Sequence, residues 1–394
     1  MENRKIEEYD VMRVILTFLV VVGHSAYLNM PFGYGGVDYT SVDCLGNVLT
    51  TNFYFYLYKL IGIIYFFHMP AFFFLSGSVF CIGMTNNKYF NLEMLVKNKI
   101  KRLIFPAVVA GVFWMVPLKY IGHGYSDSKN LPYAMFNGII LGQGTGHLWY
   151  LYTLFWIFLL AYLIIKYVIK DNKLGIIILL LMLGSLYSVI DIYFPGGNNI
   201  SYYLEFFLCG YFFEENRKKI FSNEKRYIFV FALALIIAVC SFHYTGTSIT
   251  TGKIIQDWEK TFGIIACTVI LYIGSHYCVF LLKKNTMYKF LKKHCMNVYL
   301  LHDPLNYIIL ALAAKCVGII NYQINWNTVG IVLAVVRILG TISISLILSI
   351  LINKIKIENK KIVILYSLVE IICMFLILFF NMQGISVKST IYQP

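Results

Sequence analysis

The chain has 394 residues, of which 59% are hydrophobic and only 13% are charged, and its mean hydropathy is +0.71. Soluble proteins carry about 25% charged residues, so this composition excludes an ordinary water-soluble enzyme and predicts an all-α, polytopic transmembrane helix bundle. The net charge of +14 does not predict nucleic-acid binding, because the basic residues fall in short loops between apolar segments and form no soluble basic face.

Eleven apolar segments are predicted to span the bilayer, because a spanning helix needs about 20 mainly apolar residues. They run over residues 11–30, 55–83, 101–121, 147–169, 174–194, 200–213, 227–244, 261–282, 296–320, 328–352 and 362–381. The sixth segment is short for a full crossing. We therefore predict a single integral membrane domain over residues 1–394, with about ten or eleven spans.

The Lys and Arg residues in the loops and at the ends of these segments gather on alternate sides. With the N-terminus in the cytoplasm, the predicted inner regions hold 24 of them and the predicted outer regions hold 5. Such an asymmetry is typical of the positive-inside pattern of membrane proteins. It predicts a multi-pass protein of the plasma membrane, with a cytoplasmic N-terminus and an external C-terminus.

The first predicted span carries polar side chains in an otherwise apolar run. Asp10 stands at its start, and Arg13 and His24 lie on one helix face about 16 Å apart along the axis. Ionisable side chains are costly inside a membrane and usually face the bundle interior, where they have a function. We predict a site within the membrane, in which His24 is the catalytic base and Arg13 orients the donor or stabilises charge.

The second predicted span places His68 two residues before Pro70. The proline removes a backbone donor and should bend the helix, while Ser76 and Gly77 permit close approach of another helix. A kinked and tightly packed helix explains Pro70 and Gly77 but leaves His68 unexplained. We therefore predict that His68 is catalytic and that Ser76 contacts substrate.

The later spans add weaker candidates. His302 lies near the cytoplasmic start of the ninth span, where a histidine can also simply reach water, and Asp303 is interpreted as a cap of the segment after Pro304. The outer loops place His147 and Trp149 where they could contact a sugar. The nine cysteines show no Cys-x-x-Cys and no Cys/His cluster at zinc spacing, so no metal site is predicted.

These motifs resemble those of the acyltransferase-3 family of integral membrane acyltransferases. Arg13 and His24 resemble its Arg-x10-His motif, and residues 68–77 resemble its His-Met-Pro-Leu-Phe-Phe-Phe-x-Ser-Gly motif, with Ala71 at the usual Leu position. Weaker matches to its later elements lie at residues 147–151, 206–210 and 299–302. The resemblance covers residues 1 to about 350. Members typically have ten spans, so the segment at 362–381 is a departure.

The resemblance implies an enzyme that transfers an acyl group, most often acetyl, to a hydroxyl of a cell-envelope glycan. It implies acyl-CoA (acetyl-CoA) as co-substrate with no bound cofactor, and an acceptor that is a capsule or exopolysaccharide sugar, a lipid-linked glycan or a small molecule. A histidine base suits this reaction near neutral pH. The predicted catalytic residues are His24, Arg13 and His68, and the predicted substrate-binding residues are Asp10, Ser76, Trp149, Glu205 and His302.

An alternative is a secondary transporter or exporter, in which intramembrane His and Arg residues couple transport to protons. Such folds often contain inverted repeats. The hydropathy of this chain shows no repeat, and an odd number of spans fits such a fold poorly.

Overall fold

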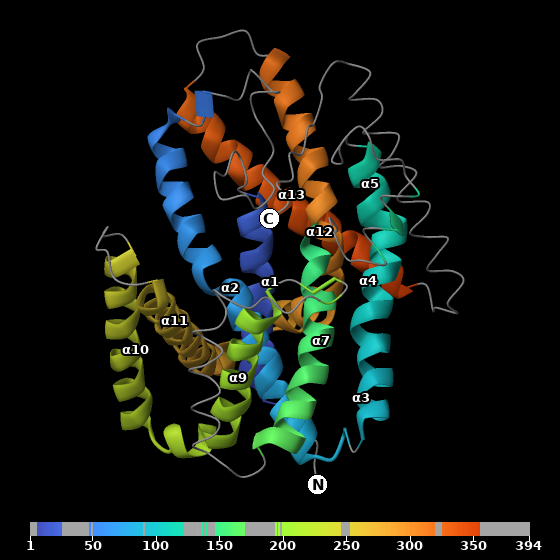
Figure 1. Ribbon diagram of the computed structural model, residues 1–394. Helices are drawn as coiled ribbons and strands as arrows, with labels where there is room; N and C mark the ends of the chain where they lie inside the picture. The colour runs from blue at the N-terminus through green and yellow to red at the C-terminus, as the bar shows by residue number, and fades with distance from the viewer. Residues whose placement is uncertain are drawn as a thin grey trace. The chain divides into compact units, whose positions relative to one another are not determined.

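The computed structural model describes residues 6–25, 47–48, 50–89, 91–121, 146–169, 199–245, 253–319 and 325–354, together with a few positions between them. Helices make up nearly all of this described part, and no strand occurs in it (Figure 1). The all-α prediction is therefore confirmed.

The helices follow the predicted apolar segments. They are α1 (Glu7–Ser25), α2 (Asn52–Thr85), α3 (Leu92–Lys99), α4 (Phe105–Ala110), α5 (Val116–Ile121), α7 (Trp149–Leu163), α9 (Ile200–Ile220), α10 (Glu224–Thr245), α11 (Lys253–Leu282), α12 (Thr286–Ile319) and α13 (Trp326–Lys354). At 21 residues, α9 is longer than the predicted sixth span, because it continues into a charged stretch.

Six helical segments of the described part are long and apolar enough to cross a bilayer. They are Asn52–Thr85, Leu92–Leu118, Gly146–Val168, Glu224–Phe242, Gln256–Leu282 and Trp326–Asn353. The predicted first, sixth and ninth spans are helices but are not among these six. The predicted spans at 174–194 and 362–381 lie outside the described residues, so the number of ten or eleven spans stays a prediction.

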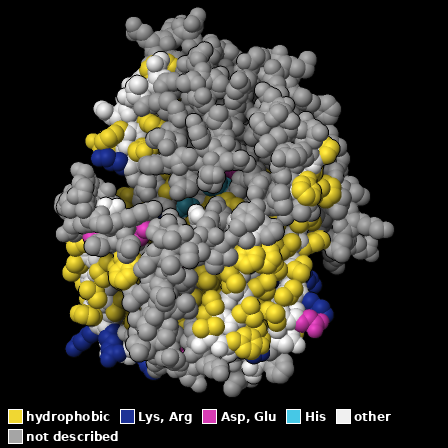
Figure 2. All heavy atoms as spheres, viewed as in Figure 1, with side chains coloured by type: hydrophobic (Ala, Val, Ile, Leu, Met, Phe, Trp, Pro, Cys, Tyr) yellow, Lys and Arg dark blue, Asp and Glu magenta, His cyan; other side chains and the backbone are white. Residues whose placement is uncertain are grey.

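Apolar side chains cover much of the described surface. Figure 2 shows them in yellow, with Lys and Arg side chains near the margins of this view. On α10, for example, Ile228, Phe229 and Ile236 are each more than 60% exposed. Water would disfavour such surfaces, whereas lipid tails accept them, and together with the six long apolar segments they identify a multi-pass membrane protein.

The described residues group into two compact units, each assembled from three stretches of sequence. The first unit lies within residues 1–16, 65–103 and 152–293, and the second within residues 17–64, 104–151 and 294–394. Four boundaries fall inside α1, α2, α7 and α12, and the fifth falls inside the helical turn Ile100–Ile104.

The run from α3 to α5 is helical from Leu92 to Ile121 (Figure 1). It contains two wide turns of π-helix, at Ile100–Ile104 and Gly111–Met115. Each wide turn comes just before a proline, Pro106 or Pro117. A proline has no N–H and its ring crowds the carbonyl one turn earlier, which favours a widened turn at that place.

In the first unit, α2 and α9 touch backbone to backbone. A Cβ atom added at Gly77 would lie 1.8 Å from the Phe207 carbonyl oxygen, and one added at Gly210 would lie 1.9 Å from the Phe74 carbonyl oxygen. Ser78 Oγ also donates to the Gly210 carbonyl at 2.9 Å. The predicted close approach of a helix at Gly77 is therefore confirmed, and its partner is α9.

We expect Gly77→Ala to destabilise the protein by about 3 kcal/mol, the upper end of the usual cost of overpacking, because the new methyl group meets backbone that cannot rotate away. Thermal unfolding in detergent measures the effect. Gly274→Ala in α11 is the matched control, since a Cβ there has no atom within 4 Å and alanine is the better helix former. A Gly77→Ala protein that melts with the wild type would contradict the expectation.

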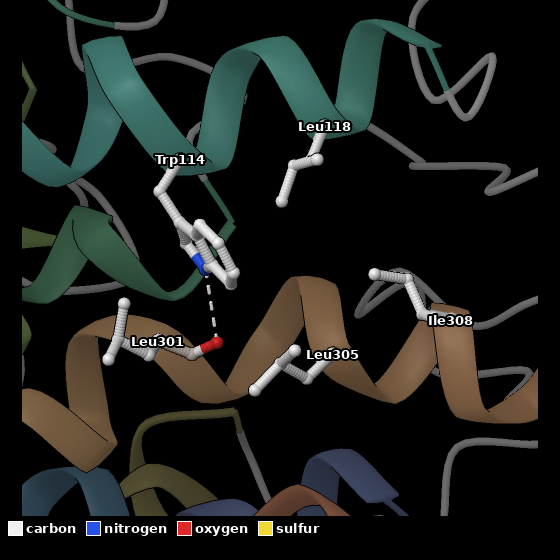
Figure 3. Close-up of a cluster of buried hydrophobic side chains, with 5 residues drawn as sticks. All are labelled: Trp114, Leu118, Leu301, Leu305 and Ile308. Atoms are coloured by element: carbon white, nitrogen blue, oxygen red, sulfur yellow. Dashed lines mark hydrogen bonds between the residues drawn. The ribbon is translucent and has the colours of Figure 1, made fainter. Parts of the chain in front are cut away.

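In the second unit, the segment around Trp114 packs against α12. Trp114, Leu118, Leu301, Leu305 and Ile308 form a buried cluster, and Trp114 Nε1 donates to the Leu301 carbonyl at 3.1 Å (Figure 3). This contact holds α12 at the turn that carries His302 and Asp303. Since α12 continues through Pro304, the interpretation of Asp303 as a helix cap is wrong.

Candidate active site

A glycine turn at the start of α7 brings His147 towards α12. Gly146 has a φ of +55°, and a Cβ added there would lie 2.2 Å from Met115 Cε and 2.8 Å from Asp303 Oδ2. Only glycine adopts this conformation without cost and leaves room for the carboxylate. The turn therefore places the Gly146 backbone directly against Asp303, one residue before His147.

Three histidines and one carboxylate meet in the second unit, from α1, α12 and the turn that leads into α7. His24 Nδ1 lies 3.4 Å from Asp303 Oδ1, and His147 Nδ1 lies 3.5 Å from Asp303 Oδ2. His302 Nε2 lies 2.9 Å from His24 Nδ1. His147, His302 and Asp303 are buried, whereas the side chain of His24 is 14% exposed. His24 is thus the ring that a substrate reaches most easily.

The Tyr299 carbonyl determines which ring nitrogens of His302 and His24 carry protons. His302 Nδ1 lies 2.7 Å from that oxygen, and because a carbonyl only accepts, Nδ1 must donate. A neutral His302 then accepts at Nε2, so the proton in the 2.9 Å contact belongs to His24 Nδ1. In neutral His24 the other nitrogen, Nε2, is left as the basic one.

His147 is held firmly by its backbone and its ring face, but not by its nitrogens. The Tyr299 hydroxyl donates to the His147 carbonyl, and the two rings meet edge to face at 5.1 Å. Neither ring nitrogen makes a hydrogen bond of normal geometry with any described residue. The Leu300 carbonyl also interacts with this ring, and it lacks its usual helical donor because Pro304 has no N–H.

The carboxylate gives the cluster its electrostatic balance. Asp303 is 6% exposed, and a buried charge is stable only when an opposite charge or several hydrogen-bond donors accompany it. One protonated imidazole beside Asp303 makes the cluster neutral. The arrangement is therefore able to accept a proton at one ring and release it at another, as acid–base catalysis requires.

Within the described part, His24, His302 and Asp303 also present ligand atoms within 4.8 Å of one another, as a metal site would. Two nitrogens bound to one tetrahedral zinc ion lie about 3.3 Å apart and both point lone pairs at the metal. His24 and His302 are closer, at 2.9 Å, and the Tyr299 carbonyl already assigns a proton to their contact. A hydrogen-bonded chain therefore describes these residues better than a metal site.

The other predicted catalytic residues belong to the first unit. Arg13 Nη1 pairs with Asp10 Oδ1 at 3.0 Å, and Lys292 Nζ lies 2.6 Å from Asp10 Oδ2. The side chain of Arg13 is 45% exposed. His68 is buried, with Tyr65 edge to face at 4.8 Å. Arg13 and Asp10 are thus brought together, and their roles in substrate binding and catalysis stay predictions.

The remaining predicted substrate contacts are spread over both units. In the first unit, Ser76 is partly buried on α2, and Glu205 is buried on α9 with Oε2 lacking a hydrogen bond among the described residues. In the second unit, Trp149 begins α7 and meets Tyr150 edge to face at 6.4 Å.

Sequence reasoning placed His24 and His302 in the site but gave Asp303 and His147 other roles. Two signals pointed to them. Asp303 follows His302 directly inside an apolar segment, and His147 follows a glycine at the start of another. Both are polar groups that a membrane helix would not carry without a reason.

Comparison with known protein families gives a match over most of the chain. A family model described as an acyltransferase domain, that of the acyltransferase-3 family, matches residues 6–354. No curated protein and no solved structure matches. The matched region includes His24, His147, His302 and Asp303 and all of the described helices. The chain therefore belongs to the acyltransferase-3 family, and it is a membrane-embedded acyltransferase.

Proposed function

We propose that this enzyme is an O-acyltransferase that moves an acyl group, acetyl in the first instance, from cytoplasmic acyl-CoA to a hydroxyl of a cell-surface or exopolysaccharide sugar. The observation that carries the proposal is the hydrogen-bonded order Tyr299 carbonyl, His302, His24. It leaves Nε2 of His24 as a base on the most accessible ring of the cluster. A hydroxyl is a weak nucleophile, and a positioned base is what its attack on a thioester requires.

A basic group on the first unit supports a phosphorylated donor. Lys99 is 8% exposed, and its ammonium lies 3.2 Å from the centre of the Phe158 ring. Lys88 and Arg102 are near enough to repel it. Burial, with a smaller contribution from Arg102, lowers the pKa of Lys88. Clustered cations of this kind are stabilised by a bound anion, and the phosphates of CoA are suitable anions.

A pair of carboxyl groups on the same unit supports a sugar acceptor. Glu205 Oε2 and Asp257 Oδ2 are buried oxygens that accept no hydrogen bond from the described residues, and the two side chains interact electrostatically. Sugar hydroxyls donate to such oxygens. On the first unit we propose Glu205 and Ser76 as acceptor contacts, and Arg13, Asp10 and His68 as groups that orient the donor. On the second unit, Trp149 is proposed as an acceptor contact.

The positive-inside pattern supports a plasma-membrane protein with its N-terminus in the cytoplasm. The test uses protein reconstituted in one orientation in vesicles, with radiolabelled acetyl-CoA added to one face at a time. We expect donor use only from the face that carries the N-terminus, and labelled product on the other face when a sugar acceptor is enclosed there. Equal use of acetyl-CoA from both faces would contradict the orientation. Failure to use it from either face would contradict the donor.

A further inference from the structure

We propose that His147 is a second catalytic residue, which gives a proton to the departing thiol while His24 takes one from the acceptor hydroxyl. This inference rests on the proposed function and adds a residue to it. His24 and His147 face opposite oxygens of one carboxylate, with Nδ1 atoms 3.4 Å from Oδ1 and 3.5 Å from Oδ2 of Asp303. Because both rings face the same carboxylate, either His24 or His147 can carry the proton that balances its charge.

The extra proton of the neutral cluster has only two places to reside. His302 is the least suitable place, because its ring is fully buried and its two nitrogens face the Tyr299 carbonyl and His24 rather than the carboxylate. The proton is therefore on His24 or on His147. Either position balances the buried charge of Asp303, so exchange between them leaves the net charge of the cluster unchanged.

His147 has two suitable partners for the proton in the resting enzyme. Its polar neighbours, Asp303 Oδ2 and the Leu300 carbonyl, are both acceptors, and an imidazolium has two N–H groups to offer them. Burial of the ring opposes the charge, and the nearby carboxylate offsets part of this effect. Since neither nitrogen makes a hydrogen bond of normal geometry with a described residue, the proton is held by charge rather than fixed in a strong bond.

The reaction then balances. The acceptor oxygen attacks the thioester carbonyl carbon, a C–O bond forms, and the hydroxyl proton passes to His24 Nε2. As the tetrahedral intermediate collapses, the C–S bond breaks, and the sulfur leaves with its electron pair and takes the proton of His147. The cluster begins with one extra proton on His147 and ends with one on His24. Return of that proton beside Asp303 restores the starting state.

The test varies the leaving group, because a thiol that departs as a stable thiolate needs no acid. Two donors are compared, the alkyl thioester S-acetyl-N-acetylcysteamine and the activated S-(4-nitrophenyl) thioacetate, with methanol as acceptor and thiol release as the measurement. His147→Asn keeps a donor near the position of Nδ1 but cannot transfer a proton. We expect it to lose about 100-fold with the alkyl thioester, the usual contribution of a general acid, and less than about fivefold with the activated one.

Two matched variants complete the experiment. His24→Asn is expected to lose activity with both donors, since the attacking hydroxyl needs its base in either case. His294→Gln alters a buried histidine of α12 that hydrogen-bonds Ser349 outside the cluster, and it is expected to retain activity with both. Equal losses of His147→Asn with the two donors, or wild-type activity with the alkyl thioester, would overturn the proposal. A wild-type enzyme that uses both small thioesters but not acetyl-CoA would contradict the proposed donor and leave the role of His147 intact.

Discussion

Replacement of His24 by alanine is expected to lower acyl transfer by at least a hundredfold, and by up to about ten-thousandfold, the range that a general base supplies. His24 is the most accessible ring of the cluster, and the chain of hydrogen bonds through His302 leaves its Nε2 as the base. Without the ring, the acceptor hydroxyl has no group to take its proton as the C–O bond forms.

Added imidazole distinguishes this chemical loss from misfolding. It should raise the rate of His24→Ala at least tenfold, because a free base can occupy the space of the missing ring. His276→Gln is the control, since His276 is 30% exposed and pairs with Glu8 in the first unit, and its activity should match that of the wild type. Near-normal turnover of His24→Ala would remove His24 from the role of base.

The Asp303→Asn variant should fold normally and lose about a thousandfold in kcat, because the neutral amide can balance no imidazolium. The loss has a second cause. An asparagine presents an N–H as well as an oxygen, which permits the wrong tautomer of a neighbouring histidine, and this effect costs about 10⁴-fold in the Ser-His-Asp enzymes. Since Asp303 acts through the histidines, the change in kcat should exceed any change in KM.

Glu93→Gln serves as the control for Asp303→Asn, because Glu93 is an exposed residue that pairs with Lys97 at the surface and should not affect turnover. The pH profile adds a readout that a purely structural role would not alter. The part of the pH–rate profile that reports protonation of His24 and His147 should shift in Asp303→Asn. It should remain in place in Glu93→Gln. An unchanged profile with reduced activity would assign Asp303 a structural role only.

Much of the helical architecture could be predicted from the chain alone, because an apolar run of 20 residues has few alternatives in a bilayer. His24 and His302 could be selected in the same way, since a buried polar group in such a run needs an explanation. Their contact could not be predicted, because the two residues are 278 positions apart and no local pattern records which helices become neighbours.

The roles of Asp303 and His147 depended on features that only three-dimensional structure reveals. Asp303 before Pro304 reads as the end of one helix and the start of another, yet α12 continues through the proline, and Trp114 supports the turn through the Leu301 carbonyl. From the sequence, His147 is interpreted as a loop residue at a membrane boundary. The left-handed turn at Gly146, directly before it, lets the backbone approach the carboxylate.

The spacing of the two outer rings of the cluster also bears on how the enzyme responds to the cell's energy state. The ring centres of His24 and His147 are 6.4 Å apart, about a fifth of the roughly 30 Å hydrocarbon core. Moving one charge across the whole core against 100 mV requires about 2.3 kcal/mol, so a proton that passes between these rings works against at most about 0.5 kcal/mol. A transporter driven by protons would sense the membrane voltage strongly. The proton exchange that we propose between His24 and His147 is almost insensitive to it.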